Sequence, residues 1–265
     1  MSRTITKDEV VSHKKKAIKA IGNTFEAFIN SPEDRHLKKA DLLAYWIESF
    51  SSYILDEEKY DYSKIPKFKR GEVISVNFGF NVGSEHGGRH YAIVLDNDNK
   101  QSSRVITVIP LSSGSSDNTN ERDVYLGNEL YDKLKTKYDK LCEENDSSMK
   151  EMTQMLEIIR KILSAEEETS NVDSEKMESF KEIVNNLEKR VDILNEEKKM
   201  LENYNKEISK LKTGSRALME QITTISKMRI YKPKTSRDLL YGIKFSDGAM
   251  DKINDKLKEL YVFSK

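Results

Sequence analysis

The sequence of 265 residues contains one cysteine and four prolines, and hydrophobic residues make up only 37% of it. Cys142 by itself cannot form an internal disulfide or a thiolate zinc site, which favours a reducing compartment. No run in the sequence approaches the roughly 20 apolar residues of a membrane span, and residues 1–16 lack the apolar segment of a signal peptide. We therefore expect a cytoplasmic protein without a membrane segment.

The chain also lacks a net charge, because 45 basic residues balance 45 acidic ones. This balance is uneven along the sequence. Residues 64–128 and 213–265 carry net charges of +1 and +5, whereas residues 1–63 and 129–212 carry −1 and −5. If residues 64–128 and 213–265 form one folded unit, its charge of +6 suits a polyanionic ligand such as nucleic acid.

Residues 129–212 show the periodicity of two long helices. Apolar residues recur every three or four positions over residues 131–162 and again over residues 177–211, on either side of a polar break at residues 164–174. Two helical arms of similar length around such a break predict an antiparallel coiled-coil hairpin.

Residues 1–63 are predicted to form two amphipathic helices. Apolar residues at helical spacing occupy residues 10–29 and 42–55, and turn-forming residues lie between them at 31–34. Trp46, the only tryptophan, falls in the second helix. We interpret it as an anchor that packs this helix on a neighbouring element.

Between residues 70 and 127 the pattern changes to short, β-branched strands. The predicted strands are residues 72–78, 91–95, 104–109 and 123–126. No helical segment alternates with them, so a parallel Rossmann sheet is excluded. We expect an α+β fold whose sheet is a small, strongly bent antiparallel β-barrel.

Several separated motifs in these strands carry a family resemblance. The run RGEVISVNFGFNVGSEHGGRHYAIVLDND, followed by VITVIPLSS, resembles the amino-terminal half of the PemK/MazF toxins. After the helical segment, ALMEQITTISKMRI resembles the carboxy-terminal half, and residues 246–261 fit the terminal helix. The resemblance covers residues 68–126 and about 214–261. It implies an SH3-like barrel whose halves, residues 64–128 and 213–265, are separated by the coiled-coil hairpin and preceded by the N-terminal helices.

The resemblance also implies a function. Members of this family are endoribonucleases that cut single-stranded RNA without a metal or other cofactor, leaving a 2′,3′-cyclic phosphate and a 5′-OH. They usually form dimers and are usually held inactive by an antitoxin protein. The alternative is a non-catalytic nucleic-acid-binding or regulatory protein on the same barrel, with the coiled coil as a protein-interaction arm.

The family's catalytic residues map onto this sequence with one displacement. Ser112 takes the place of the hydroxyl residue that closes the third strand. The catalytic arginine normally follows the Gly-Gly pair after one intervening residue, but that position is His90 here and Arg89 precedes it. Three interpretations remain open. His90 faces the pocket as acid or base while Arg89 reaches the phosphate from the loop; a bulge restores Arg89 to the site; or His90 only caps the strand and the enzyme is weak or inactive.

Other residues are expected to contact RNA or to shape its channel. These are Ser84 and Glu85 in the family's loop, and Arg229 and Lys232 as phosphate contacts. Gln221 is either a reader of a base edge or a buried structural polar group. His86 and His90 are four residues apart, but no third ligand accompanies them. We therefore predict that the chain has no metal site.

Overall fold

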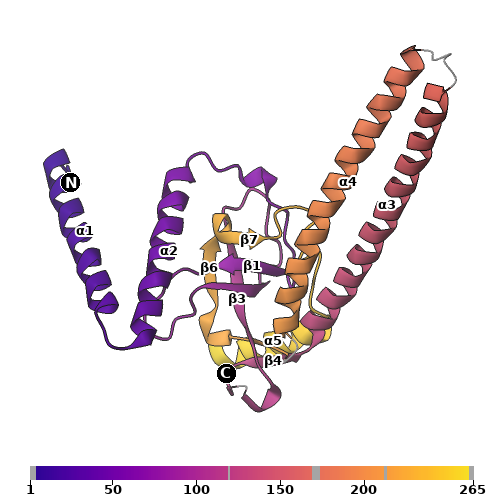
Figure 1. Ribbon diagram of the computed structural model, residues 1–265. Helices are drawn as coiled ribbons and strands as arrows, with labels where there is room; N and C mark the ends of the chain where they lie inside the picture. Colours follow the sequence, from indigo (N-terminus) through magenta and orange to yellow (C-terminus); the bar gives the residue numbers. More distant parts are fainter. Residues whose placement is uncertain (1–3, 119, 169–173, 212–213, 263–265) are drawn as a thin grey trace.

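The computed structural model describes residues 4–118, 120–168, 174–211 and 214–262. Its α-helices are α1 (Lys7–Ile29), α2 (Asp34–Asp56), α3 (Glu129–Glu168), α4 (Ser174–Ile208) and α5 (Asp247–Tyr261). Its strands are β1 (Val73–Asn77), β2 (Arg89–Val94), β3 (Val105–Ser113), β4 (Val124–Gly127), β5 (Ser215–Ala217), β6 (Thr223–Ser226) and β7 (Ile230–Lys232). Short 3₁₀ turns include η3 (Ser209–Leu211), η4 (Met219–Gln221) and η5 (Lys227–Arg229). The predicted combination of N-terminal helices, antiparallel strands and a long helix pair is confirmed (Figure 1).

Local side chains explain where several helices begin. Thr6 and Glu9 form a reciprocal capping box at the start of α1, which satisfies two backbone N–H groups that would otherwise lack a partner. Ser246 accepts a hydrogen bond from the N–H of Ala249 and so caps α5. These caps fix two helix starts that periodicity alone places only approximately.

Strands from before and after the long helix pair form one antiparallel sheet. The strand order is β4-β5-β3-β2-β1-β7, and β6 pairs with β3 beside this path. A closed barrel was expected from the sequence, but β4 and β7 do not pair among the described residues, so the sheet remains open. The two edge strands are short, with four residues in β4 and three in β7, so they offer few backbone groups for a closing ladder.

Both faces of the sheet are covered, because neighbouring residues of one strand enter different cores. Ile74 and Val76 of β1 belong to one buried cluster, whereas Val73 belongs to the other. The cluster with Val73 also contains Leu134 of α3 and Ile208 of α4. Two buried faces explain why these strands read as nearly continuous apolar runs.

The helix pair α3–α4 rises from the sheet as a long projection (Figure 1). Asn145 lies buried between the helices and donates from Nδ2 to the carbonyl of Leu194 at 3.1 Å. Arg160 pairs with Glu188 at 2.8 Å further along. The polar break was expected at residues 164–174; α3 extends to Glu168, and residues 169–173 lie outside the described residues.

Candidate active site

Arg89 and His90 lie side by side at the start of β2. The ladder with β1 pairs Asn77 with Arg89, Val76 with His90 and Ser75 with Tyr91, and no register shift interrupts these pairs. In a regular strand, successive side chains leave opposite faces of the sheet. The bulge considered for Arg89 is therefore absent from this β1–β2 ladder, although one does separate Ser75 from Val76 on the β7 side.

The two side chains accordingly have different neighbours. The Arg89 guanidinium lies over the ring of Tyr231, 4.3 Å from its centroid. The ring of His90 lies 4.1 Å from the ring of His86, in the loop that leads into β2. Arg89 thus belongs to the surface formed with β7, and His90 to the loop.

A cavity of about 240 Å³ brings the three predicted catalytic residues together. Arg89, His90 and Ser112 all line it. The other lining residues are Ser75, Tyr91, Leu111, Ser113, Leu130, Glu207, Lys210, Leu211 and Ser215. Glu207 and Lys210 from the end of the helix pair therefore border the same cavity as Arg89 and Ser112. Ser112 itself is half-buried, and its Oγ donates to the carbonyl of Ser113 at 3.3 Å.

The two histidines of the loop are held in a partly buried cluster. The backbone N–H of His86 donates to Oε1 of Gln221 at 3.0 Å, and Phe78 meets the His86 ring edge-on. Burial, together with the nearby His90, lowers the pKa of His86 to about 4. Burial also lowers the pKa of His90, partly opposed by a backbone contact with Gly87. Both rings are therefore uncharged at neutral pH.

Gln221 connects η4 to the same loop. Besides accepting from His86, it donates from Nε2 to the carbonyl of Ser84 at 3.3 Å. Both ends of its amide are therefore engaged with loop backbone. Ser84 and Glu85 are exposed, and Glu85 accepts a hydrogen bond from the N–H of Val82 at 3.3 Å.

Arg229 lies against α2 and is partly buried. Its Nε donates to the carbonyl of Asn77 at 2.8 Å, and its guanidinium lies 5.2 Å from the ring of Trp46 on α2. Burial lowers the pKa of Arg229 without removing its charge. Trp46 thus has the anchoring contacts expected of it, and one of them is to a residue predicted to bind RNA.

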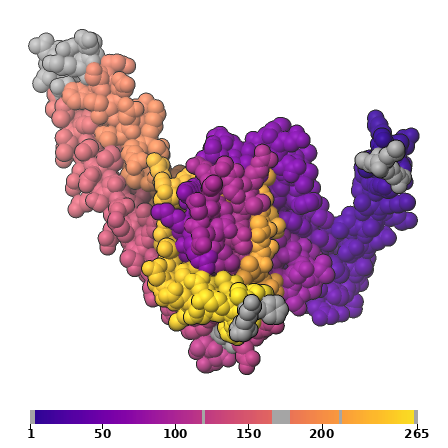
Figure 2. Space-filling model, turned by 180° about the vertical axis from the view of Figure 1, so that it is seen from behind, coloured from indigo at the N-terminus to yellow at the C-terminus, as the bar shows by residue number. Residues whose placement is uncertain are grey.

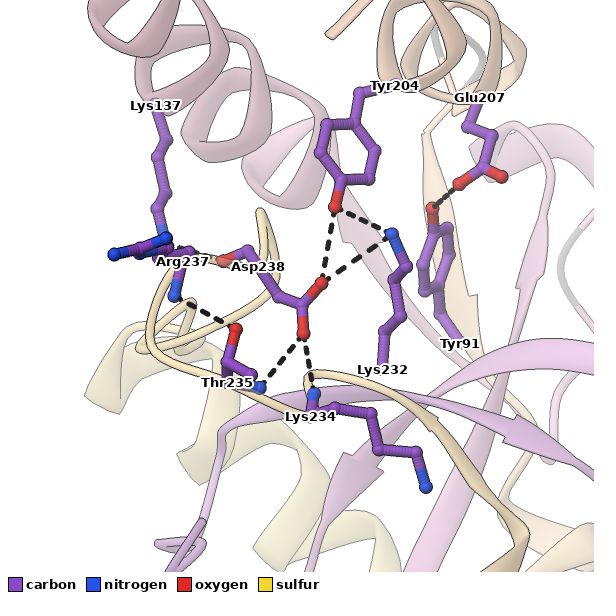
Figure 3. Close-up of polar contacts among 9 residues, drawn as sticks. All are labelled: Tyr91, Lys137, Tyr204, Glu207, Lys232, Lys234, Thr235, Arg237 and Asp238. Carbon is purple, nitrogen blue, oxygen red and sulfur yellow. Dashed lines mark hydrogen bonds and ion pairs between the residues drawn. The ribbon is translucent and has the colours of Figure 1, made fainter. Parts of the chain in front are cut away.

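Lys232 is the centre of a polar cluster between β7 and α4 (Figure 3). Its ammonium donates to the hydroxyl of Tyr204 at 2.6 Å and lies 3.6 Å from Oδ1 of Asp238. Asp238 also accepts from the backbone N–H groups of Lys234 at 2.6 Å and Thr235 at 3.0 Å. Burial acts to lower the pKa of Lys232, but Tyr204 and the Asp238 charge outweigh it and leave that pKa raised.

The helix pair contributes residues that the sequence did not single out. Tyr91 of β2 donates from its hydroxyl to Glu207 of α4 at 3.5 Å, a contact visible in Figure 3. Glu207 and Lys210 line the cavity beside Arg89. Tyr204 lies three residues after Leu201 of the apolar seam. This helical spacing could have predicted that Tyr204 faces the interior. No local signal links Glu207 or Lys210 to β2, more than 110 residues earlier.

Comparison with known families identifies a related family. Residues 69–198 match the model of the PemK-like, MazF-like toxins of type II toxin-antitoxin systems. This match assigns residues 69–198, just under half of the chain, to the PemK/MazF toxin family. The match spans β1 to β4 and extends into α4, so it contains Arg89, His90 and Ser112 but ends before β5. No curated protein matches the sequence.

No helix of the described residues is long and apolar enough to cross a membrane. Within the same residues, no group of three or more His, Cys, Asp or Glu side chains is arranged to hold a metal ion.

Proposed function

We propose that this chain is a toxin-type endoribonuclease that cleaves single-stranded RNA without a metal ion. The observation that carries the proposal is the cavity shared by Arg89, His90 and Ser112. RNA cleavage through the ribose 2′-OH needs a proton acceptor, charge stabilisation at phosphorus and a proton donor for the leaving oxygen. The residues that line the cavity include one suited to each role, and the family match supports the same class of reaction.

In the proposed reaction, the uncharged His90 accepts the proton of the 2′-OH. The 2′ oxygen then bonds to phosphorus while the bond from phosphorus to the 5′ oxygen breaks. Arg89 and the Ser112 hydroxyl stabilise the charge that develops on the phosphoryl oxygens. The Lys210 ammonium, which lines the same cavity, supplies a proton to the departing 5′ oxygen. The products are a 2′,3′-cyclic phosphate and a 5′-OH.

The proposal extends to the surroundings of the cavity. Ser84 and Glu85 contact the RNA from the exposed loop. The RNA passes beside Gln221, Arg229 and Lys232, whose contacts keep the neighbouring loop and strands in position. The half-exposed ring of Tyr231, already covered on one side by Arg89, offers a surface for base stacking. We further propose that the sheet is a variant of the SH3-like barrel and that an antitoxin protein restrains the enzyme in the cytoplasm.

A cleavage assay in chelator tests the function. Single-stranded RNA is incubated with the purified full-length protein in EDTA, and the fragment ends are mapped. We expect 2′,3′-cyclic phosphate and 5′-OH ends, lost in Arg89→Ala and in Ser112→Ala. Arg104→Ala is the matched control, because Arg104 also lies over a tyrosine ring, that of Tyr62, but does not line the cavity. Intact RNA, or equal cleavage by all variants, would defeat the proposal.

The second candidate is an RNA-binding protein that does not cleave. It is favoured by the histidine at the position where the family carries its catalytic arginine, since an uncharged ring there cannot replace a guanidinium. Binding and cleavage measured on the same RNA separate the two candidates. Retained binding that requires Arg89, without any fragment formation, supports the second.

A further inference from the structure

Ser112 and Arg216 lie opposite each other on two neighbouring strands. The β3–β5 ladder pairs Ser112 directly with Arg216, and the pairs on either side keep the same register. In an antiparallel ladder, two residues in direct opposition leave the same face of the sheet, with Cβ atoms about 5 Å apart. The Arg216 side chain therefore starts beside the Ser112 hydroxyl, although the two residues are more than a hundred positions apart.

His90 lies on the same face of the sheet as these two residues. Ala92 is opposite Pro110 in the β2–β3 ladder. His90 precedes Ala92 by two positions, and Ser112 follows Pro110 by two positions. Residues two positions apart in a strand share a face. His90, Ser112 and Arg216 thus form a row across β2, β3 and β5, which we call the polar row.

The long helices pack on the other face of the sheet. Ala92, which shares the face of the polar row, belongs to the core cluster that contains Ile74 and Val76. The other cluster contains buried residues of α3, α4 and α5, namely Leu134, Ile208 and Ile253. Figure 2 shows the N-terminal helices and the helix pair projecting from opposite sides of the body. Each residue of the polar row is half-buried, so a ligand can reach it from solvent.

The Arg216 guanidinium lies at the end of β3. A Cβ on Gly114, two residues after Ser112, would lie 3.4 Å from Nε and 3.7 Å from Cζ of Arg216. Arg216 also acts on Asp123, just before β4: burial raises the pKa of Asp123, and the Arg216 charge opposes that rise. A guanidinium has five N–H donors, so Arg216 can face Asp123 and still bind a phosphate.

We infer that Arg216 binds an RNA phosphate on the face of the sheet that it shares with His90 and Ser112. The inference rests on the proposed function, to which it adds a second guanidinium. In place of the family's arginine this chain has His90, whose ring is uncharged at neutral pH, and Arg89 leaves β2 on the other face. Arg216 is the one cation of the polar row, and it lies beyond the residues that match the family.

The row gives a phosphate above Ser112 two different neighbours. The imidazole of His90 lies on one side of it and the Arg216 guanidinium on the other. The planar fork of Arg216 can donate to two non-bridging oxygens as negative charge develops on them. Arg216 transfers no proton, because a guanidinium stays protonated in proteins.

Binding of an uncleavable RNA analogue tests this contact separately from cleavage. The probe is a fluorescent single-stranded 2′-O-methyl oligonucleotide, whose blocked 2′ oxygen cannot attack phosphorus. We expect Arg216→Ala to raise its Kd about tenfold. The slope of log Kd against log salt should fall by about 0.7, as for the loss of one phosphate contact. Arg122→Ala is the matched control, because Arg122 is a nearby exposed arginine that pairs with Glu220 at 2.9 Å.

Two further variants separate phosphate binding from a structural role. Arg216→Gln keeps the length and polarity of the side chain, and it should weaken binding as Arg216→Ala does. Asp123→Asn should bind the analogue at least as tightly as the wild-type protein, because it removes a carboxylate beside the phosphate. If Arg216 only held Asp123 in place, Asp123→Asn would weaken binding as much as the Arg216 variants.

Cleavage of unmodified RNA, measured on the same variants, separates this inference from the proposed function. We expect Arg216→Ala to lower the single-turnover rate by about 100-fold. Binding that depends on Arg216, without cleavage by the wild-type protein, would uphold the phosphate contact and reject the ribonuclease. Analogue binding that is absent in the wild-type protein, unchanged in both Arg216 variants, or weakened equally by Asp123→Asn overturns the inference.

Discussion

Arg89 and His90 are adjacent in β2, yet their side chains leave the strand in different directions. The Arg89 guanidinium lies over Tyr231, and the His90 ring lies against His86. The unbroken ladder with β1 enforces this division. Both residues nonetheless border one cavity, and the displacement of the family's arginine by one position changes which of the two side chains faces each side of β2.

Replacement of Arg89 should show whether cleavage needs only the positive charge of this side chain or also the planar shape of its guanidinium. We expect Arg89→Ala to lower the rate of RNA cleavage by about 10²–10³-fold, as for loss of one donor to a developing oxyanion. Arg89→Lys should recover only part of the rate, because an ammonium cannot make two parallel contacts to phosphate or stack as a plane on Tyr231. Rates measured under single-turnover conditions, with Arg104→Ala alongside, check this. Full activity of Arg89→Lys would contradict the need for a planar guanidinium.

The pH profile of cleavage should report His90. Burial lowers the pKa of His90, so the imidazole stays uncharged and able to accept a proton until the pH falls below the ordinary histidine value of about 6.5. We expect the cleavage rate to fall as the pH is lowered, with a midpoint below that value. His90→Ala should abolish this acid-side dependence of the rate. His13→Ala, on the exposed part of α1, is the control. A midpoint at or above 6.5 would count against His90 as the base.

Acid should also destabilise the loop through His86. The pKa of His86 is about 4 in the folded protein and about 6.5 when unfolded. The unfolded chain therefore binds more protons between these values, and stability falls as pH is lowered from about 6.5 towards 4. We expect His86→Gln to reduce this loss, measured by urea unfolding at pH 7 and pH 5. The control is His13→Gln. If both variants lose as much unfolding free energy between pH 7 and pH 5 as the wild-type protein does, this would be evidence against a buried uncharged His86.

Gly79, in the loop after β1, lies against Trp46 of α2. It has a φ of +83°, and a Cβ there would lie 2.7 Å from the Trp46 ring. Gly79→Ala should therefore lower the free energy of unfolding by about 3 kcal/mol, from backbone strain and displacement of the ring. Gly83→Ala is a matched control with a φ of +64° and open space, and should cost about 1 kcal/mol. Equal losses of unfolding free energy in the two variants would mean that the Trp46 ring does not pack closely against the loop.

Asp238 should hold the helix pair to the sheet. Its carboxylate accepts from two backbone N–H groups and faces Lys232 and Tyr204. We expect Asp238→Ala to destabilise the protein by about 3 kcal/mol, and Tyr204→Phe by about 1 kcal/mol. Hydrogen exchange should quicken at residues 200–208 in both variants. The control is Asp247→Ala on α5, whose side chain is almost fully exposed at 96%. Unchanged exchange at residues 200–208 would contradict this role.

The sequence alone determined the elements of this protein. Helical spacing located α1, α2 and the long pair α3–α4, and short β-branched runs located β1 to β4, because both patterns arise from side chains that are near in sequence. The ordered motifs around Gly87 and Ser112 also indicated the toxin family.

Only the tertiary structure decided how these elements meet. It left the sheet open, directed Arg89 and His90 to different neighbours, and tied both ends of the Gln221 amide to the loop. It also brought Glu207 and Lys210 from the end of the helix pair to the cavity beside β2. Apart from the contact between His86 and His90, these contacts join residues more than a hundred positions apart, and they depend on strand register and helix direction, which periodicity does not encode.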